Sequence, residues 1–134
     1  MNRRAAGRGR GFTLVEIMVV ISIMLILLAV AMPIYSHSLT RKREETLRQN
    51  LETLNKVIVQ YTLDKQKAPK SLDDLVQAGY LKPPIPEDIT GRNDTWVTEE
   101  GNTIMSLEQK ETGISGVHSG SNQTASDGTA YSSW

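Results

Sequence analysis

Apolar residues along the chain fall into one long run followed by a periodic stripe. From Ile17 to Met32 every residue is apolar except Ser22, and the stretch from Phe12 to Tyr35 covers 24 residues. A helix of that length is about 36 Å long, which is enough to cross a bilayer. The run therefore predicts a membrane-spanning helix at residues 12–35.

Helical periodicity replaces the continuous run after Pro33. Apolar residues recur mostly three or four positions apart, and charged or amide side chains occupy the opposite side. This spacing is typical of a helix that packs one face on a domain. The stripe consists of Leu47, Leu51, Leu54, Val57, Ile58 and Tyr61. We expect one helix from about Phe12 to about Leu63, with residues 36–66 as its soluble continuation.

The stretch between the run and the stripe is polar. It contains Arg41-Lys42-Arg43 followed directly by Glu44-Glu45. We interpret it as a solvated helical segment just outside the membrane. Pro33, near the end of the span, lacks the amide that would bond to Ala29 and predicts either a kink or the end of the span.

Residues 67–134 are expected to form a small globular domain. Ser71 with Asp74 predicts the N-cap of a short helix, and Gly79 predicts its end. Strands are expected at 94–98 and 103–107, joined by a hairpin loop at 99–102. Packing of this sheet on the long helix would bury Trp96, Ile104 and Leu107, and Ile114 with Val117 could add a strand. The expected fold class is α+β, a long N-terminal helix on a small antiparallel sheet.

Charge is distributed unevenly although the formal net charge of the whole chain is zero. The leader at residues 1–11 contains no acid and four arginines, Arg3, Arg4, Arg8 and Arg10. Positive charge beside a span fixes its cytoplasmic end, so we expect the N-terminus inside and the C-terminal domain outside. Without the leader, 11 basic and 15 acidic side chains remain, a net charge of about −4. The balance gives no reason to expect nucleic-acid binding.

An acidic residue, Glu16, stands at the start of the apolar run. A carboxylate inside a membrane costs free energy and calls for a partner of opposite charge. The leader and the residues Gly11-Phe12-Thr13-Leu14-Val15-Glu16 together resemble the class III signal of type IV pilins and of type II secretion pseudopilins. That resemblance implies a prepilin peptidase that cuts between Gly11 and Phe12 and methylates the new N-terminus at Phe12. It also implies that Glu16 pairs with the terminal amine of a neighbouring subunit, and that the helix opens beside Pro33 in the filament.

Other interpretations of this junction remain open. Arg3-Arg4 could belong to a twin-arginine export signal, or the whole segment could be an ordinary signal peptide. Ordinary signals place the apolar stretch before the cut, whereas here the expected cut comes first. In a simple signal anchor, Glu16 would have no role.

The absence of cysteine excludes disulfides and thiolate chemistry. Many type IV pilins carry a disulfide-bounded loop, which major pseudopilins usually lack, so the chain resembles the major pseudopilins of type II secretion. The resemblance implies self-assembly into a periplasmic pseudopilus from the bacterial inner membrane. The implied partners are the inner-membrane secretion platform and minor pseudopilins. The alternatives are a type IV pilin of a surface pilus and a membrane-anchored binding protein that never polymerises.

The last residues of the chain, from Thr112, are rich in glycine, serine and threonine and end on Tyr131 and Trp134. Major pseudopilins have a similar ending, which implies calcium, with Asn122 and Asp127 as candidate ligands. Calcium prefers six to eight oxygens and usually several carboxylates, whereas this loop offers one. The alternative is an ordered loop held by Asx turns and by the two aromatic residues.

Catalytic activity is not expected. The histidines His37 and His118 have no partner at a metal-binding spacing, and Ser119-Gly120-Ser121 is not a nucleophile elbow. Asp73-Asp74 and Glu99-Glu100 are adjacent acids on surface segments. We therefore predict a structural subunit and no enzyme.

Overall fold

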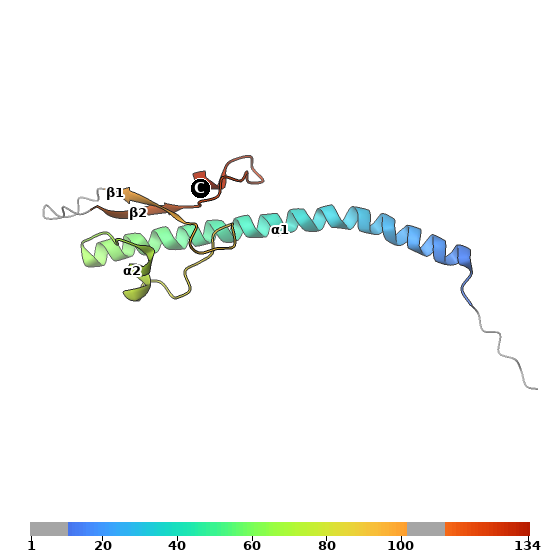
Figure 1. Cartoon of the computed structure of the whole chain (residues 1–134), viewed down its shortest axis with the longest axis horizontal. Coiled ribbons are helices and arrows are strands. Elements are labelled where there is room, and N and C mark those ends of the chain that lie inside the picture. Colours follow the sequence, from blue (N-terminus) through green and yellow to red (C-terminus); the bar gives the residue numbers. More distant parts are fainter. Residues whose placement is uncertain (1–10, 102–111) are drawn as a thin grey trace, which may run out of the picture. The chain divides into compact units, whose positions relative to one another are not determined.

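The computed structural model describes residues 11–101 and 112–134, which Figure 1 draws in colour. The chain divides into two compact units, Met1–Ser38 and Leu39–Trp134. Along the chain, the described elements are helix α1 (Leu14–Lys65), helix α2 (Leu72–Gln77), strand β1 (Val97–Gly101), strand β2 (Gly113–His118) and a short 3-10 helix (Tyr131–Ser133). A long helix and a two-stranded antiparallel sheet confirm the predicted α+β fold class.

Helix α1 agrees closely with the helix expected from the apolar pattern. It begins two residues after Phe12 and ends two residues after Leu63. Pro33 lies inside the helix and does not end it. The polar Ser22 donates its hydroxyl to the Met18 carbonyl at 2.7 Å, so its side chain is satisfied within the helix.

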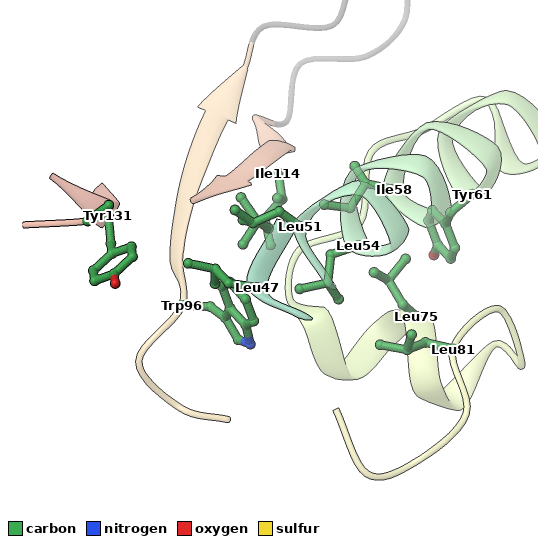
Figure 2. Packing of buried hydrophobic residues seen from close by; sticks show 12 residues of the cluster. Leu47, Leu51, Leu54, Ile58, Tyr61, Leu75, Leu81, Trp96, Ile114 and Tyr131 are labelled. Carbon is green, nitrogen blue, oxygen red and sulfur yellow. The ribbon is translucent and has the colours of Figure 1, made fainter. Parts of the chain in front are cut away.

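The core of the C-terminal unit forms around the stripe on α1. Figure 2 shows stripe residues of α1 facing Leu75 and Leu81 on one side and Trp96 and Ile114 on the other. The buried stripe residues are Leu47, Leu51, Leu54, Ile58 and Tyr61. Val57 is partly buried against them. Trp96 is buried as predicted, and its indole N–H donates to the Pro86 carbonyl at 2.7 Å. Burial of these side chains is the main source of stability of the unit.

Helix α2 has the ends that its sequence predicts. The Ser71 hydroxyl accepts from the Asp74 amide, and the Asp74 carboxylate accepts from the Ser71 amide, which completes a capping box. At the other end, Gly79 has a φ of 81° and donates to Val76, while Tyr80 donates to Leu75. This pair of bonds is a Schellman motif, which requires a left-handed residue and explains the glycine.

The sheet differs from the predicted hairpin. Strand β1 begins at Val97, not Asp94, and residues 99–101, expected in the loop, belong to the strand. Its partner is β2, which contains Ile114 and Val117. The expected strand 103–107, with Ile104 and Leu107, lies outside the described residues.

A β-bulge in strand β2 explains why Ile114 and Val117, which are three positions apart, both face the core. Glu99 pairs with Gly116 and Glu100 with Ile114, so Ser115 is the extra residue on β2. One extra residue shifts the alternation of side chains by one position. Ile114 and Val117 are therefore both buried, while Ser115 is exposed.

Candidate functional site: the N-terminal junction and the C-terminal clamp

Thr13 caps the N-terminus of α1. Its side-chain oxygen accepts from the Glu16 amide at 3.2 Å, and its carbonyl accepts from the Ile17 amide at 3.1 Å. Threonine at this position satisfies one of the amides that a helix start leaves without a partner. The cap fixes Glu16 in the first turn of the helix.

The Glu16 side chain is exposed, and within the described parts of the chain it forms no ion pair. A helix N-terminus carries partial positive charge, which favours a carboxylate in the first turn. The geometry therefore presents an anion at the entrance of an apolar helix and leaves it open to a cation from another molecule.

The N-terminal unit, which contains this junction, has an apolar surface. From Phe12 to Tyr35, all residues are exposed, and Glu16 is the only charged one. By length and composition, α1 is the one described helix that could cross a membrane, and the apolar window is not buried within the chain. A surface of this kind needs lipid or other apolar helices around it.

The remaining predicted residues of the junction lie where the sequence suggested. Gly11 and Phe12 precede the helix, lie outside any helix or strand and are exposed, so the expected cut falls on an accessible segment. Pro33 is exposed within α1. Their roles in cleavage, methylation and assembly stay predictions.

Comparison with known proteins supports this interpretation of the junction. Residues 7–32 match the family model of the prokaryotic N-terminal methylation motif. This motif is typical of type IV pilin-like structural subunits, which are not enzymes, and it implies a substrate of prepilin peptidase that assembles into filaments. Together with the apolar helix, it indicates membrane anchoring. No curated protein and no solved structure matches the chain.

A second constellation joins α1 to the end of the chain, and we call it the C-terminal clamp: Glu44, Arg48, Ser126, Asp127, Thr129, Tyr131 and Trp134. Its centre is the carboxylate of Glu44, which accepts from the Ser126 amide at 2.7 Å and from the Tyr131 hydroxyl at 2.9 Å. The Ser126 hydroxyl also donates to it. Glu44 is 7% exposed. Its expected position in a solvated segment is therefore wrong.

The hydrogen bonds decide the protonation state of Glu44. Those from Ser126 hold the pKa of the Glu44 carboxyl below its usual value, although burial acts in the opposite direction. Burial, followed by the bond to Glu44, raises the pKa of Tyr131. Glu44 is therefore ionised at neutral pH and Tyr131 is a neutral donor, which is the combination that these bonds require.

Arg48, one turn further along α1, completes the clamp. Its guanidinium lies 3.3 Å from the Asp127 carboxylate and 4.1 Å from the centroid of the Trp134 ring. The Trp134 indole N–H donates to the Thr129 hydroxyl at 2.7 Å. Since Arg48 holds a loop acid and the terminal aromatic together, the last ten residues are fixed by side chains of one helix face.

A buried aspartate, Asp88, binds the segment that directly follows β2. The Asp88 side chain accepts from the Ser119 hydroxyl at 2.6 Å, the Gly120 amide at 3.1 Å and the Thr95 hydroxyl at 3.0 Å. Asp88 is 4% exposed. Gly120 leaves no room for a side chain, because a Cβ would lie 2.0 Å from the Thr95 carbonyl oxygen.

The candidate calcium ligand Asp127 already has partners within the chain, and the other candidate, Asn122, is exposed. The Asp127 carboxylate accepts from the Thr129 amide at 2.9 Å and hydroxyl at 2.6 Å and pairs with Arg48. No group of three or more acidic, histidine or cysteine side chains in the described residues could hold a metal. A guanidinium beside the only loop carboxylate opposes a cation there. The geometry favours the alternative, an ordered loop held by an Asx turn and aromatics, and calcium stays an untested prediction.

Removal of calcium is expected to leave the stability of the chain unchanged. The Arg48 guanidinium supplies the positive charge that a metal would otherwise provide, and hydrogen bonds from Thr129 bind the Asp127 oxygens that would coordinate it. Thermal unfolding of the full chain in detergent, with calcium and with chelator, should give the same Tm. A higher Tm with calcium that Asp127→Asn removes would contradict this expectation.

The clamp and the cap were both missed in the sequence, although each left a signal. Glu44 precedes Leu47 by three positions and therefore lies on the same helix face as the buried stripe. Thr13 and Glu16 have the Thr-x-x-Glu spacing of a helix start. Arg48 gave no such signal, because its contact with Trp134 joins residues far apart in the sequence.

Proposed function

We propose that the chain is the precursor of the major pseudopilin of a type II secretion system. Prepilin peptidase would cut between Gly11 and Phe12 and methylate Phe12, and the mature chain would polymerise through its apolar helix. The pseudopilus would grow in the periplasm with the help of minor pseudopilins and the inner-membrane platform, and would move proteins through the outer membrane. The observation that carries the proposal is the exposed Glu16 at the start of an exposed apolar helix, inside a matched methylation motif.

Pairing of Glu16 with the terminal amine of a neighbour would stabilise both charged groups in the membrane. Each is a charge that apolar surroundings penalise, and each is a hydrogen-bonding partner for the other. The Thr13 cap holds the backbone of Glu16 in the first turn of the helix, so the incoming subunit would meet the carboxylate at a defined position along α1. Because a single Glu16 is available in each chain between residues 12 and 35, the pair would also set the register of the helices.

Two features favour a pseudopilin over a surface pilin. The chain has no cysteine, and therefore no disulfide closes its terminal loop. The loop is closed instead by the C-terminal clamp, which ends on the aromatic Trp134. The second candidate is a type IV pilin subunit, which the N-terminal motif supports equally.

The membrane topology in this proposal follows from charge. The arginine-rich leader would stay in the cytoplasm and the C-terminal unit would face the periplasm. A membrane-anchored protein that never polymerises would have the same topology. It would leave the exposed Glu16 without a partner in an apolar environment, which is why we favour the filament.

Replacement of Gly11 with a bulky residue is expected to block processing. Gly11 is exposed and precedes the capped helix, so Gly11→Leu should leave membrane insertion and the fold of both units intact. The precursor should then accumulate uncut in cells that contain prepilin peptidase, as a slower band on an immunoblot. Gly9→Leu, another glycine of the leader, is the matched control. Normal processing of the Gly11→Leu chain would show that the cut lies elsewhere.

A further inference from the structure

Three consecutive cations on α1 lie between the apolar run and the buried stripe, and we call them the basic triad: Arg41, Lys42 and Arg43. All three are exposed, and none forms an ion pair within residues 11–101 and 112–134. Exposed cations without a partner are common, but these follow the last aromatic residue of the span, Tyr35, by only six positions. Six residues of helix rise about 9 Å, so the triad stays close to the membrane surface whichever way the soluble unit points.

Lys42 and Arg43 also line a groove on the C-terminal unit. The groove has a volume of about 460 Å³, and its other wall is the loop of residues 87–91. The Asn50 side chain donates to the Glu87 carbonyl at 3.0 Å and ties this loop to α1. Both walls of the groove are therefore parts of the folded C-terminal unit.

In the described residues, the acids near the groove form no ion pair with the triad. Asp88 lines the groove, but its carboxylate already accepts four hydrogen bonds, from Ile89, Thr95, Ser119 and Gly120. The Glu44 carboxylate is bound within the C-terminal clamp. The two buried carboxylates keep their negative charge, whereas among the exposed side chains the three cations of the triad outnumber Glu45 and Glu87. An anion in solution or at a surface therefore meets more positive than negative side chains here.

We propose that the basic triad binds the phosphate of an anionic phospholipid headgroup, in the leaflet at the C-terminal end of the span. The phosphate would be held by Lys42 and Arg43 at the mouth of the groove, and Arg41 would contact a neighbouring headgroup. Long basic side chains reach headgroups from just outside the hydrocarbon region. This lipid contact requires the membrane-spanning helix of the proposed function but does not require filament assembly. A subunit that leaves the membrane would lose the contact.

The test measures lipid binding to the full chain in neutral detergent by native mass spectrometry. Phosphatidylglycerol and phosphatidylcholine with the same acyl chains are compared. The chain should bind phosphatidylglycerol several-fold more tightly. The triple variant Arg41→Gln, Lys42→Gln, Arg43→Gln should lose this preference, because each basic residue near a surface contributes about fivefold in affinity. A control with Lys56→Gln, Lys65→Gln and Lys67→Gln removes the same charge from exposed positions of the unit and should bind as the unchanged chain does.

Several results would overturn the proposal. Equal affinity of the two lipids would do so, as would equal losses in the triple variant and its control. Full competition by inorganic phosphate at the same concentration would assign the groove to a free anion. A dimer in detergent that only the triple variant loses would assign the triad to a second copy of the chain.

Two further measurements separate this proposal from misfolding and from the proposed function. In the unchanged chain, raising salt from about 0.1 M to about 1 M shortens the Debye length from about 10 Å to about 3 Å and should weaken the preference. A preference that salt does not change would contradict an electrostatic contact. The Glu16→Ala chain should keep its lipid preference even where it fails to assemble, so the two hypotheses can fail independently.

Discussion

Replacement of Glu16 with alanine is expected to reduce filament growth strongly while leaving membrane insertion and processing intact. A hydrogen bond to a charged group contributes about 1.5–3 kcal/mol, and each 1.4 kcal/mol is a factor of ten in association. Loss of one such contact at every subunit should lower assembly by about ten- to a hundredfold. Sheared filaments recovered by sedimentation and counted by electron microscopy provide the measurement.

Two variants show whether charge is the cause. Glu16→Gln keeps the shape of the side chain but not its charge, and it should fail as alanine does. Ser22→Ala removes another polar group from the same span, but its hydroxyl is already bonded to the Met18 carbonyl, so assembly should be normal. Filaments of Glu16→Ala in normal number would remove the proposed role of Glu16.

Replacement of Glu44 with alanine is expected to cause a large loss of stability in the C-terminal unit. The change leaves the buried Tyr131 hydroxyl and the Ser126 amide without their acceptor. A buried polar group that loses its partner costs about 1–3 kcal/mol, so we expect a loss of about 2 kcal/mol or more. Since 1 kcal/mol changes the Tm of a domain of this size by about 4–8 °C, the Tm should fall by roughly 10 °C.

The neighbouring acid provides the matched control. Glu45 is exposed, and Glu45→Ala should change stability by no more than about 0.5 kcal/mol. Thermal unfolding of both full chains in the same detergent, followed by circular dichroism and tryptophan fluorescence, gives the comparison. Equal melting of the two variants would show that the clamp does not stabilise the unit.

The pH dependence of stability follows from the same carboxylate. The folded pKa of Glu44 is lowered, so its contribution is fully present above the usual pKa of about 4.3 and is lost as pH falls through the lower folded value. Glu44→Gln should therefore narrow the difference in stability between pH 7 and pH 3. An unchanged pH profile in this variant would contradict the lowered pKa.

Local patterns allowed much of the fold to be predicted from sequence. The apolar run and the stripe determine α1, and the Ser71–Asp74 capping box with Gly79 determines α2. These signals depend on residues a few positions apart. The strands were harder to predict from the sequence, because β1 has no buried side chain and the bulge at Ser115 breaks the alternation that marks a strand.

The two candidate sites also differ in how well the sequence predicts them. The N-terminal junction lies in consecutive residues, and its motif could be recognised directly. The C-terminal clamp joins Glu44 to Ser126 and Tyr131, more than 80 positions away, and no local pattern shows which terminal residues a helix acid will meet. The ion pair between Arg48 and Asp127 argues against calcium at Asp127. No local pattern in the sequence indicates this pair, so this argument became available only from the structure.

Processing at Gly11–Phe12 can be measured as the intact mass of the chain purified from membranes of cells that contain prepilin peptidase. We expect the mass of residues 12–134 plus one methyl group, with fragmentation placing that group on the N-terminal amine of Phe12. A chain that keeps residues 1–11, or that begins at another residue, would contradict it.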